Sequence, residues 1–325
     1  MKIVRFGLIG LGKISTRFAS VLDGMEGVEL EAIASSERSR SEIFAQKYHA
    51  RKVYSSYENV ITDPEVDVVY IGLTNNFHYE FIKSCLEHHK AVMCEKPLVT
   101  TLKEAQELIA LANKNNTLLM EAMWTRCLPA YKKAREWVKK GKIGEVKLIT
   151  ANFCYNKKYT PEIRQYNSKL LGGSLFDVGV YPIFFTTGIL SAHPEKVSGL
   201  AKITPGNVDE SAVISMSFTG GTLASLSCGF NVNAKDEAVV YGTKGKLVLD
   251  NCFGPQICEY YNDEKELIER FEDRVADGFI FEIQHCADLF RQGKIESDLI
   301  PWADTMACAG IFDSLRSNWG MFEGQ

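Results

Sequence analysis

The sequence lacks an excess of charge of one sign, lacks internal repeats, and has no cysteines at metal-binding spacing. Across 325 residues, 37 Lys and Arg residues nearly balance 41 Asp and Glu residues, so the net charge is only −4. Nucleic acids and anionic membranes attract concentrated positive charge, so we expect neither as a partner of this chain. We also expect no apolar run long enough to cross a bilayer.

The nine cysteines are an odd number, and none belongs to a Cys-x-x-Cys pair. Such usage is typical of reduced thiols in a cytoplasmic protein and does not suit a disulfide framework. Clustered Cys and His residues at zinc-binding spacing are absent, so we expect no metal site. The N-terminal residues lead directly into an apolar segment, Val4–Ile9, so we expect no signal peptide. The sequence thus predicts a soluble, cytoplasmic protein.

Two domains are predicted from the pattern of apolar residues. Residues 2–121 alternate between strand-like and helix-like segments, which specifies an α/β domain of the Rossmann type with a doubly wound parallel sheet. From residue 122 onward, strands with polar alternation and hairpin turns indicate an α+β domain with a large, mainly antiparallel sheet. We therefore place a dinucleotide-binding domain at residues 1–121 and a substrate-binding domain at residues 122–325. In the first domain, Ile43, Phe44 and Tyr48 are predicted to share the buried face of one helix.

A glycine-rich turn leads from the first predicted strand into a helix, in the sequence GLIGLGKIS. Gly10 permits the tight turn, and Gly12 lets the backbone approach a pyrophosphate. The helix that opens with Lys13 and Ile14 supplies amide donors and a positive dipole end. Ser15 takes the third position of the fingerprint and is small enough for close helix–strand packing. A turn that binds nothing is the alternative, but the strand–turn–helix context favours a dinucleotide.

The second predicted strand ends at Ser35, Ser36, Glu37 and Arg38, where a dinucleotide-binding domain recognises the ribose. NAD recognition usually places an acidic residue at this tip, whereas serine hydroxyls and a guanidinium suit a 2′-phosphate. We therefore predict NADP, with NAD as the alternative because Glu37 can bind ribose hydroxyls. Arg38 can equally be a solvated residue of the following helix.

The loop after the next strong strand carries Thr74, Asn75 and His78, which we expect to border the cofactor. Asn75 can bond the ribose or cap the following helix. His78 can face the nicotinamide or pack as an ordinary structural histidine.

The sequence Cys94-Glu95-Lys96-Pro97-Leu98 follows a short apolar run that is typical of a buried parallel strand. A lysine at the carboxyl end of such a strand lies where open α/β sheets bind ligands. Pro97 fixes φ and raises the chance of a cis peptide bond, so it would aim Lys96 in one direction. A solvated lysine in an ordinary turn is the alternative.

The second dense motif is GGSLFDVGVYP, which contains Asp177 and Tyr181 four residues apart. That spacing places both side chains on one face of a helix. Asp177 as a helix cap and Tyr181 as a core residue are the structural alternatives. A tyrosine hydroxyl, whose ordinary pKa is about 10, needs a nearby cation to transfer protons at neutral pH. We predict that Lys96 supplies this cation.

The sequences GLIGLGKIS, TNNFH, CEKPL and GGSLFDVGVYP together resemble the Gfo/Idh/MocA oxidoreductase family. The stretch MEAMWTR, with Tyr181, looks most like the branch that contains dimeric dihydrodiol dehydrogenases and xylose-type sugar dehydrogenases. The resemblance implies an open-faced second domain and a homodimer, or a dimer of dimers, joined through its sheet. It also implies hydride transfer between a nicotinamide and a hydroxyl-bearing carbon of a sugar, polyol or cyclic diol.

The resemblance implies roles for individual residues. Lys96 would be the catalytic lysine, Tyr181 the acid/base and Asp177 a substrate ligand, while Glu95 and a cis Lys96–Pro97 bond would shape the nicotinamide pocket. The side chains that are plausible walls of the substrate pocket, or equally of a core, are Trp124, Arg126, Phe153 and Phe279.

The sequence also departs from the family pattern. Many members have histidine where this chain has Tyr181, which favours the dihydrodiol and sugar branch. The frequent Pro-Asn is Thr74-Asn75 here, and the arginine frequent after the second strand is Ser36, which weakens the prediction of NADP. Two rival functions remain: a redox-neutral lyase or glycosidase that uses bound NAD transiently, and a nucleotide sensor without chemistry. A sensor is expected to lack the lysine and the tyrosine.

Overall fold

The structure is a computed structural model that describes residues 2–321. The chain forms two compact units. The first comprises the residues up to Val99, then Lys103–Ala122 and Asp277–Thr305; the second comprises Thr100–Leu102, Met123–Ala276 and the residues from Met306 onward. These units differ from the predicted ranges chiefly in the segment Asp277–Thr305, which returns to the first unit.

The first unit contains a six-stranded sheet in the order β3-β2-β1-β4-β5-β6, in which all neighbours are parallel. The doubly wound parallel sheet predicted from the sequence is therefore confirmed. Its strands are β1 (Val4–Ile9), β2 (Val28–Ala34), β3 (Lys52–Tyr54), β4 (Val68–Ile71), β5 (Ala91–Glu95) and β6 (Leu119–Ala122).

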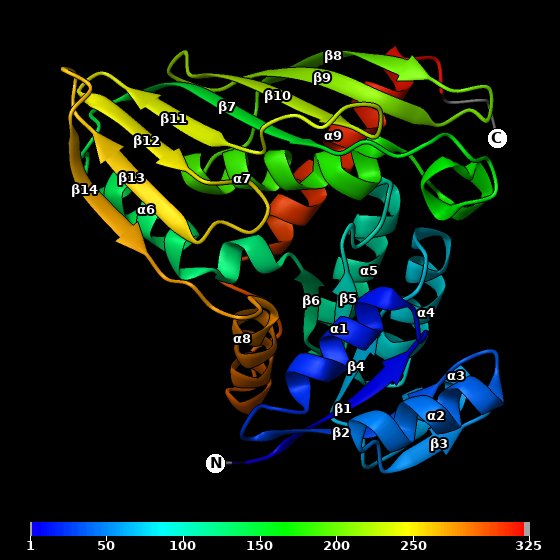
Figure 1. Cartoon of the computed structure of the whole chain (residues 1–325). Coiled ribbons are helices and arrows are strands. Elements are labelled where there is room, and N and C mark those ends of the chain that lie inside the picture. The colour runs from blue at the N-terminus through cyan, green and yellow to red at the C-terminus, as the bar shows by residue number, and fades with distance from the viewer. Residues whose placement is uncertain (1, 322–325) are drawn as a thin grey trace. The chain divides into compact units, whose positions relative to one another are not determined.

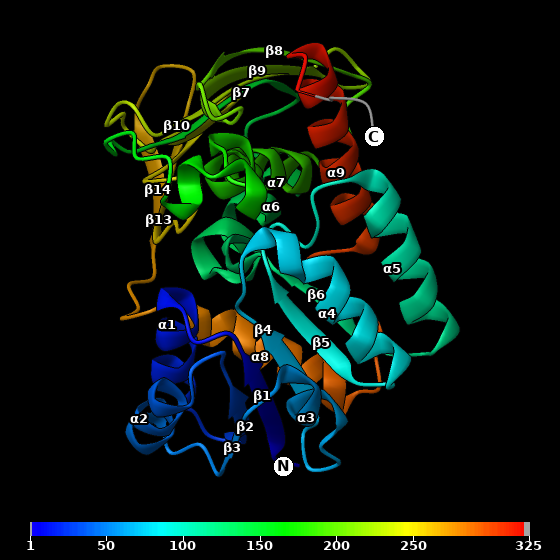
Figure 2. The ribbon, with the colours of Figure 1, turned by 90° about the vertical axis from the view of Figure 1, so that its right-hand side faces the viewer.

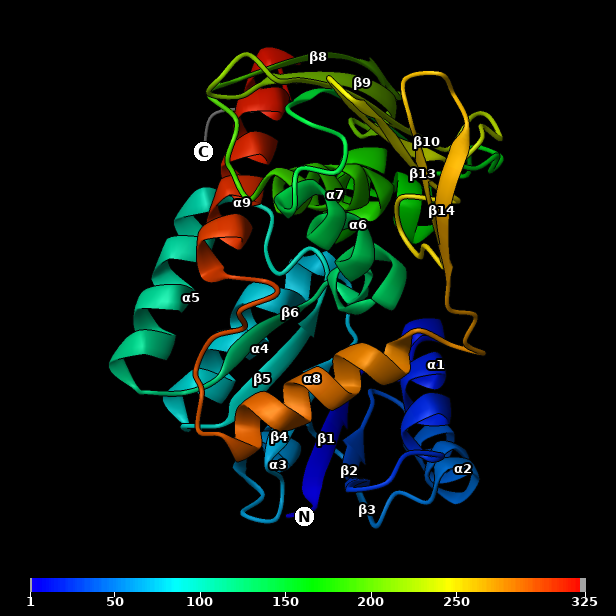
Figure 3. The same cartoon turned by 90° about the vertical axis from the view of Figure 1, so that its left-hand side faces the viewer.

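Helices cover both faces of this sheet. Helices α1 and α8 pack on one face, and α3 and α4 lie on the other, as Figures 2 and 3 show from opposite sides. The helices of the unit are α1 (Lys13–Leu22), α2 (Arg38–Tyr48), α3 (Tyr57–Thr62), α4 (Asn75–Glu87), α5 (Leu102–Lys114) and α8 (Phe279–Arg291).

The buried face of α2 differs from the prediction. Phe44 and Tyr48 are buried as expected, but Ile43 is 70% exposed. The buried positions are Ser41, Phe44, Ala45 and Tyr48, which follow the three-and-four spacing of one helix face. Ile43 is one residue before Phe44 and so points about 100° away from it.

The second unit contains an eight-stranded sheet in the order β14-β13-β12-β11-β7-β10-β9-β8, visible in Figure 1. Every neighbouring pair is antiparallel except β10 with β7, so the predicted, mainly antiparallel sheet is confirmed. Its strands are β7 (Val146–Cys154), β8 (Lys196–Ile203), β9 (Asp209–Ser217), β10 (Leu223–Gly229), β11 (Ala238–Gly242), β12 (Gly245–Leu249), β13 (Ile257–Tyr261) and β14 (Leu267–Glu272).

Helices α6 (Pro129–Lys139) and α7 (Val180–Leu190) lie against one face of the eight-stranded sheet, and α9 (Trp302–Asn318) packs near its β8–β9 end (Figures 1 and 2). Along residues 2–321, no helix covers the opposite face. Short 3₁₀ turns occur at Trp124–Cys127, Arg164–Tyr166 and Ser168–Leu170, and a π-helical turn at Leu175–Gly179 precedes α7.

The segment Ser168–Leu190 corrects one sequence expectation, because by length and composition it could cross a membrane. Of its most apolar stretch of 18 residues, 89% is buried inside the protein. A helix that is apolar all round is either a core helix or a membrane span, and such burial is the pattern of a core helix.

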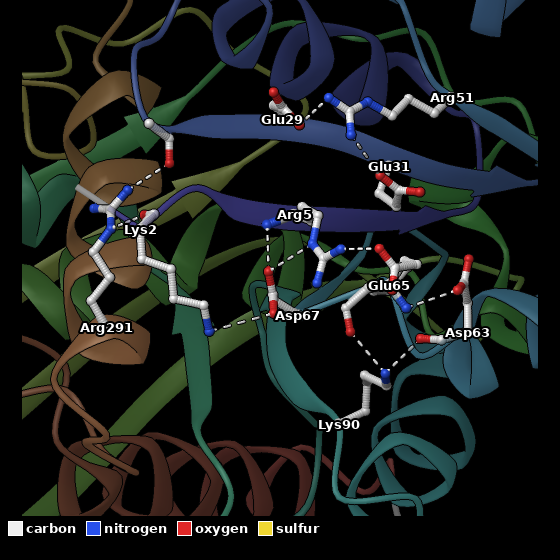
Figure 4. A network of polar contacts seen from close by, with 12 residues as sticks. Lys2, Arg5, Glu29, Glu31, Arg51, Asp63, Glu65, Asp67, Lys90 and Arg291 are labelled. Carbon is white, nitrogen blue, oxygen red and sulfur yellow. Dashed lines mark hydrogen bonds and ion pairs between the residues drawn. The ribbon is translucent and has the colours of Figure 1, made fainter.

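A polar network lies at the amino-terminal end of the parallel sheet (Figure 4). The Asp63 carboxylate accepts hydrogen bonds from Lys52 at 2.9 Å and Tyr54 at 3.0 Å. The Lys90 ammonium donates to the carbonyl oxygens of Asp63 and Val66, at 2.8 Å each. Opposite charges are therefore paired at this end of the sheet.

Other polar contacts of the network involve β1 and α8. Arg5 on β1 pairs with Asp67 at 3.3 Å. Arg291 at the end of α8 donates to the backbone carbonyls of Lys2 and Gly27, at 2.9 and 2.6 Å. Arg291 thus fastens α8 to the backbone just before β1 and just before β2.

Candidate active site

The glycine turn between β1 and α1 has the form that a pyrophosphate requires. Gly10 has a φ of +81°, and a Cβ there would lie 2.5 Å from the Leu73 side chain, so only glycine fits. Gly12 precedes α1, which has no side-chain cap, so the first amides of α1 lack a capping side chain. A Cβ on Gly12 would meet only the Gly72 carbonyl, at 3.8 Å, which leaves the turn open to a ligand. The residues present thus fit a dinucleotide phosphate.

The side chains of this turn divide into exposed and buried ones. Lys13 is exposed and Ile14 half-buried at the start of α1, while Ser15 is fully buried as predicted for close packing. A Cβ on Gly72 would lie 2.1 Å from the Ser15 hydroxyl, so the third fingerprint position contacts the loop after β4 directly.

The two serines at the carboxyl end of β2 differ in burial and in hydrogen bonding. The Ser35 hydroxyl is buried and bonds the Ser41 hydroxyl at 2.9 Å and the Glu37 carbonyl at 2.8 Å, so it already has partners inside the protein. Ser36 is exposed. Arg38 is exposed and pairs with Glu42 one turn along α2, at 3.0 Å.

Arg40 is a candidate that the sequence reasoning missed. Its guanidinium donates to the backbone carbonyl of Leu11 inside the glycine turn. It lies two residues beyond Arg38, so the helical rotation of α2 aims the two arginines in different directions. The signal was present as a second arginine in the first turn of the helix.

The loop after β4 leads directly into α4, which begins at Asn75. Thr74 is the N-cap residue and Asn75 is the first helical residue, so of the two alternatives for Asn75 the cap does not apply. The Thr74 hydroxyl donates to the Asn76 side chain at 2.7 Å. Asn75 is buried beside this turn.

His78 is fully buried, with its Nδ1 at 2.9 Å from the Pro97 carbonyl and its Nε2 at 3.2 Å from the Leu73 carbonyl. Burial lowers the pKa of the His78 imidazole, although hydrogen bonds to these carbonyl oxygens oppose the shift. His78 therefore joins the loop after β4 to the backbone that follows Lys96. This is the structural alternative that the sequence left open.

Strand β5 ends at Glu95, and the next peptide bond, Lys96–Pro97, is cis as predicted. Lys96 is half-buried. The buried Glu95 carboxylate accepts a hydrogen bond from the Tyr70 hydroxyl at 2.6 Å. Burial raises the pKa of Glu95, opposed by the Tyr70 hydrogen bond and by the charge of Lys96.

A second acid, Glu282 on α8, is close enough to Glu95 for the charge of Glu95 to act on it. Glu282 is fully buried, and neither of its oxygens has a hydrogen-bond partner among the described residues. Burial, and then the charge of Glu95, raise the pKa of Glu282 well above its ordinary value. Glu282 is therefore a buried acid whose charged form is disfavoured by burial and by the charge of Glu95. The sequence analysis missed it because it lies in the apolar run FIFEIQ.

In the second unit, Asp177 lies within the π-helical turn and is not a helix cap. Its carboxylate accepts from Arg164 at 2.8 Å and from the Tyr155 hydroxyl at 3.1 Å. Burial, and then the charge of Asp177, raise the pKa of Tyr155. Neither Arg164 nor Tyr155 was singled out from the sequence.

Tyr181 is half-buried in the first turn of α7 and belongs to an aromatic cluster. Its ring centroid lies 5.5 Å from that of Phe153 and 6.1 Å from that of Phe253. Phe153 and Phe253 stack at 4.0 Å, and Phe153 also contacts Tyr155 at 6.2 Å. The two strand-adjacent aromatics, Phe153 and Tyr155, thus link Tyr181 to Asp177.

The other predicted pocket residues lie in different surroundings. Trp124 is half-buried, and its ring is so close to Gly254 that a Cβ there would lie 2.5 Å away. Arg126 is buried and donates to the Phe184 carbonyl at 2.8 Å and to Thr187 at 2.9 Å, so it holds α7. Phe279 is buried in the first unit beneath the Arg17 guanidinium, at 3.9 Å. Arg126 and Phe279 take the core role that the sequence left open.

No group of three or more His, Cys, Asp or Glu side chains within residues 2–321 is placed to hold a metal ion.

Comparison with known proteins gives the family. Residues 4–123 match the oxidoreductase family with an NAD-binding Rossmann fold, and residues 131–248 match the GFO/IDH/MocA C-terminal domain. The chain is 31% identical to trans-1,2-dihydrobenzene-1,2-diol dehydrogenase of Mus musculus over 98% of this chain and 97% of that protein. It is 32% identical to the Homo sapiens enzyme over the same shares.

Solved structures agree on the fold. A 3-ketoreductase from Actinomadura kijaniata, in complex with NADP and TDP-benzene, superposes with a TM-score of 0.88 at 26% identity, covering 97% of this chain and 98% of that one. An aldose-aldose oxidoreductase from Caulobacter crescentus gives a TM-score of 0.88 at 21% identity, covering 98% of both chains, and shows the fold alone. The chain therefore belongs to the Gfo/Idh/MocA family of oxidoreductases with an NAD-binding Rossmann domain.

Proposed function

We propose that this protein is an NAD(P)-dependent dehydrogenase or reductase that interconverts a secondary alcohol and its carbonyl in a small sugar, polyol or cyclic diol. The observation that carries the proposal is the carboxyl edge of the parallel sheet, where an uncapped glycine turn follows β1 and Lys96 follows β5, with only β4 between these two strands. The relatives named as diol dehydrogenases and a 3-ketoreductase support the substrate class.

The proposed chemistry assigns one proton-transfer group and one cation. A bound nicotinamide supplies the hydride acceptor or donor. In oxidation, Tyr181 takes the hydroxyl proton as the hydride leaves the same carbon, and in reduction Tyr181 returns that proton to the carbonyl oxygen. Lys96 stabilises the developing alkoxide and favours the ionised phenol.

The surrounding residues orient these two groups. Glu95, held by Tyr70, and Pro97, contacted by His78, fix the backbone on both sides of Lys96. Asp177 is held by Arg164 and Tyr155, and its carboxylate would bind a second substrate hydroxyl. The stacked Phe153–Phe253 pair beside Tyr181 would exclude water from the reacting carbon.

Net absorbance at 340 nm tests the reaction class. Purified protein is mixed with NADP⁺ or NAD⁺ and a panel that includes trans-1,2-dihydrobenzene-1,2-diol, xylose and simple polyols. We expect reduced nicotinamide to accumulate with at least one substrate. Substrate conversion without any net change at 340 nm would instead identify a redox-neutral lyase or glycosidase.

For the cofactor we propose NADP, with the 2′-phosphate bound by an arginine of the first turn of α2. Arg40 reaches the glycine turn, whereas Arg38 pairs outward with Glu42. Arg40→Ala is therefore expected to raise the KM for NADP⁺ about tenfold and to leave that for NAD⁺ nearly unchanged. Arg38→Ala is the matched variant, and an NADP⁺ effect confined to it would transfer the role to Arg38.

We also propose a homodimer formed through the uncovered face of the eight-stranded sheet. Alternation along its strands exposes Leu200, 77% exposed, and Val213, 55% exposed, which are paired in register on β8 and β9. A hollow of ≈ 480 Å³ lies in the same face. A second copy of this face would cover the aliphatic side chains isologously.

Oligomeric state tests the dimer. Val213→Arg is expected to convert the protein to a monomer in sedimentation analysis. Ile43→Arg, at an aliphatic residue of α2 that is even more exposed than Val213, is the control and is expected to remain dimeric. A wild-type monomer, or a dimer in both variants, would contradict this interface.

The proposed compartment is the cytoplasm. All nine cysteines are buried and none is in a disulfide. Thiol titration of the unfolded protein, purified without reductant, is expected to find all nine reduced; disulfides in protein freshly isolated from its native source would contradict a reducing compartment.

A further inference from the structure

The helix that carries Asp177 and Tyr181 has no cap in its own sequence. The π-helical turn begins at Leu175, and the preceding residue, Ser174, makes no side-chain capping hydrogen bond. The first amides of a helix need an acceptor, particularly when they are buried. Leu175 and Ser174 are both fully buried, so water is not available as that acceptor.

The missing acceptor comes from a different strand. Asp209, the first residue of β9, is buried, and its Oδ2 accepts hydrogen bonds from the Leu175 amide and from the Ser174 hydroxyl, at 2.6 Å each. The other oxygen, Oδ1, lies 2.2 Å from the position of a Cβ on Gly173, whose φ is +116°. Only glycine can therefore precede Ser174 without displacing the carboxylate.

Packing holds the same turn from two further sides. On β10, the Cys228 sulfur lies 3.5 Å from the Ser174 hydroxyl and would be 3.0 Å from a Cβ on Gly179. On α9, Phe312 packs edge-on against Phe176 at 5.1 Å. Asp209 supplies the polar anchor among these apolar contacts.

We propose that Asp209 is a positioning residue for the reaction: from β9 it anchors the first turn of the helix that carries Asp177 and Tyr181, and so sets where both side chains point. The inference rests on the proposed roles of Asp177 and Tyr181. Asp177 is two residues beyond Leu175, and Tyr181 is six residues beyond it. A shift of this first turn therefore moves both functional groups together.

The charge of Asp209 gives the anchor a pH dependence. Burial raises the pKa of Asp209 to about 6, opposed by the hydrogen bonds from Ser174 and Leu175. The groups that face it are Arg316 on α9, beside Asp313, and the Cys228 thiol on β10, whose pKa is raised by burial and then by Asp209. Asp209 is thus ionised at neutral pH, where its charge suits the positive end of the helix, and becomes neutral as the pH falls below about 6.

The test is Asp209→Asn with a control of matched chemistry. Asp250 also accepts two backbone amides, those of Gln256 and Ile257 at 3.0 and 3.1 Å, but in an exposed hairpin. Asp209→Asn is expected to lower kcat on the order of 10- to 100-fold at pH 7.5, because small misplacements of reacting groups are costly. The Kd for NADP⁺ is expected to stay unchanged, as is the kcat of Asp250→Asn.

Two readouts separate positioning from general damage. The wild-type kcat is expected to fall as the pH drops below about 6, and Asp209→Asn is expected to lack this part of the profile. Amide hydrogen exchange over residues 173–181 is expected to accelerate in Asp209→Asn and not in Asp250→Asn, a readout that needs no substrate. Ser174→Ala, which keeps the Leu175 contact, is expected to show the same changes more weakly and carries the test if Asp209→Asn does not fold.

The outcomes distinguish this inference from the proposed function. If Asp209→Asn exchanged the amides of residues 173–181 at the wild-type rate, the role of Asp209 would be overturned. A kcat of Asp209→Asn equal to that of the wild type at every pH would overturn it as well. A wild-type protein inactive on every alcohol and carbonyl, with faster exchange in Asp209→Asn, would overturn the proposed function and leave the anchor standing.

Discussion

The two ends of the parallel sheet in the first unit both bury charged side chains, but they combine them differently. At the amino-terminal end, Asp63 is paired with Lys52, and burial, which would raise its pKa, is outweighed by the Lys52 hydrogen bond and others, so that the pKa of Asp63 is lowered. At the carboxyl-terminal end, Glu95 and Glu282 are two buried acids that interact electrostatically, and the pKa of each is raised by burial.

This difference separates a structural end of the sheet from a functional one. Paired opposite charges at the amino end satisfy one another and fasten strands to helices (Figure 4). At the carboxyl end, two buried acids whose charged forms are disfavoured reduce stability, and Glu282 has no hydrogen-bond partner within residues 2–321. Such arrangements concentrate where chemistry occurs. The comparison predicts that substitutions at the two ends have opposite signatures in stability and turnover.

The largest expected effect is on turnover, from the two lysines at opposite ends. Lys96→Met is expected to lower kcat by on the order of 10²- to 10⁴-fold, because the alkoxide loses its cation, with little change in NADP⁺ affinity by calorimetry. Lys90→Met removes a lysine that donates to two backbone carbonyls at the amino end. It is expected to lower the melting temperature and to leave kcat unchanged. A loss of kcat in Lys90→Met together with an unchanged kcat in Lys96→Met would contradict the comparison.

The next effect is on stability, at the amino end. Asp63→Asn is expected to lower the free energy of unfolding by about 2–3 kcal/mol, because Lys52 and Tyr54 lose a charged acceptor. The pKa of Asp63 is lower in the folded state, so its contribution is present above the unfolded pKa of about 3.9 and is lost as the pH falls through the folded value. Denaturant titrations of wild type and variant should therefore converge in acid; a constant difference would exclude this linkage.

Glu282→Gln is expected to act in the opposite direction. The pKa of Glu282 is higher in the folded state, so its contribution to stability is present below about pH 4.3 and is lost as the pH rises through the folded value. Glutamine carries no such penalty, and the variant should gain about 1–3 kcal/mol at pH 8 and nothing at pH 4. Glu26→Gln, at an exposed position of the same unit, serves as the control and should show no pH-dependent gain.

The smallest effect concerns Tyr70. Tyr70→Phe removes the donor to Glu95, and we expect the pKa of Glu95 to rise further and kcat to fall about fivefold at neutral pH. Tyr79→Phe removes the same kind of contact, a hydroxyl 2.6 Å from Glu107, at an exposed site. Equal rate profiles for the two variants would deny Glu95 a role in the reaction.

Local pattern was enough to predict the parts of the molecule that depend on neighbouring residues in sequence. The glycine turn, the alternating strands and helices, and the cis Lys96–Pro97 bond all follow from short-range spacing and proline chemistry. Strands β8, β13 and β14 are harder to predict from the sequence, because charged or serine residues interrupt their apolar positions.

Contacts between distant segments could not be read from the sequence. Tyr70 and Glu95 are 25 residues apart, and Ser174 and Asp209 are 35 apart, so no helical or strand periodicity relates them. Arg164 and Arg40 each reach their partners through a specific turn of a loop or helix. Only the folded chain shows which of several ordinary polar residues face one another.

The central claim is that Lys96 and Tyr181 act on the same oxygen of the substrate, and a double-variant cycle tests it most directly. The kcat values of Lys96→Met, Tyr181→Phe and the double variant are compared with that of the wild type at one pH. Residues that act as a unit give non-additive losses, so the double variant should be about as slow as the slower single variant. A loss equal to the product of the two single losses would contradict the claim.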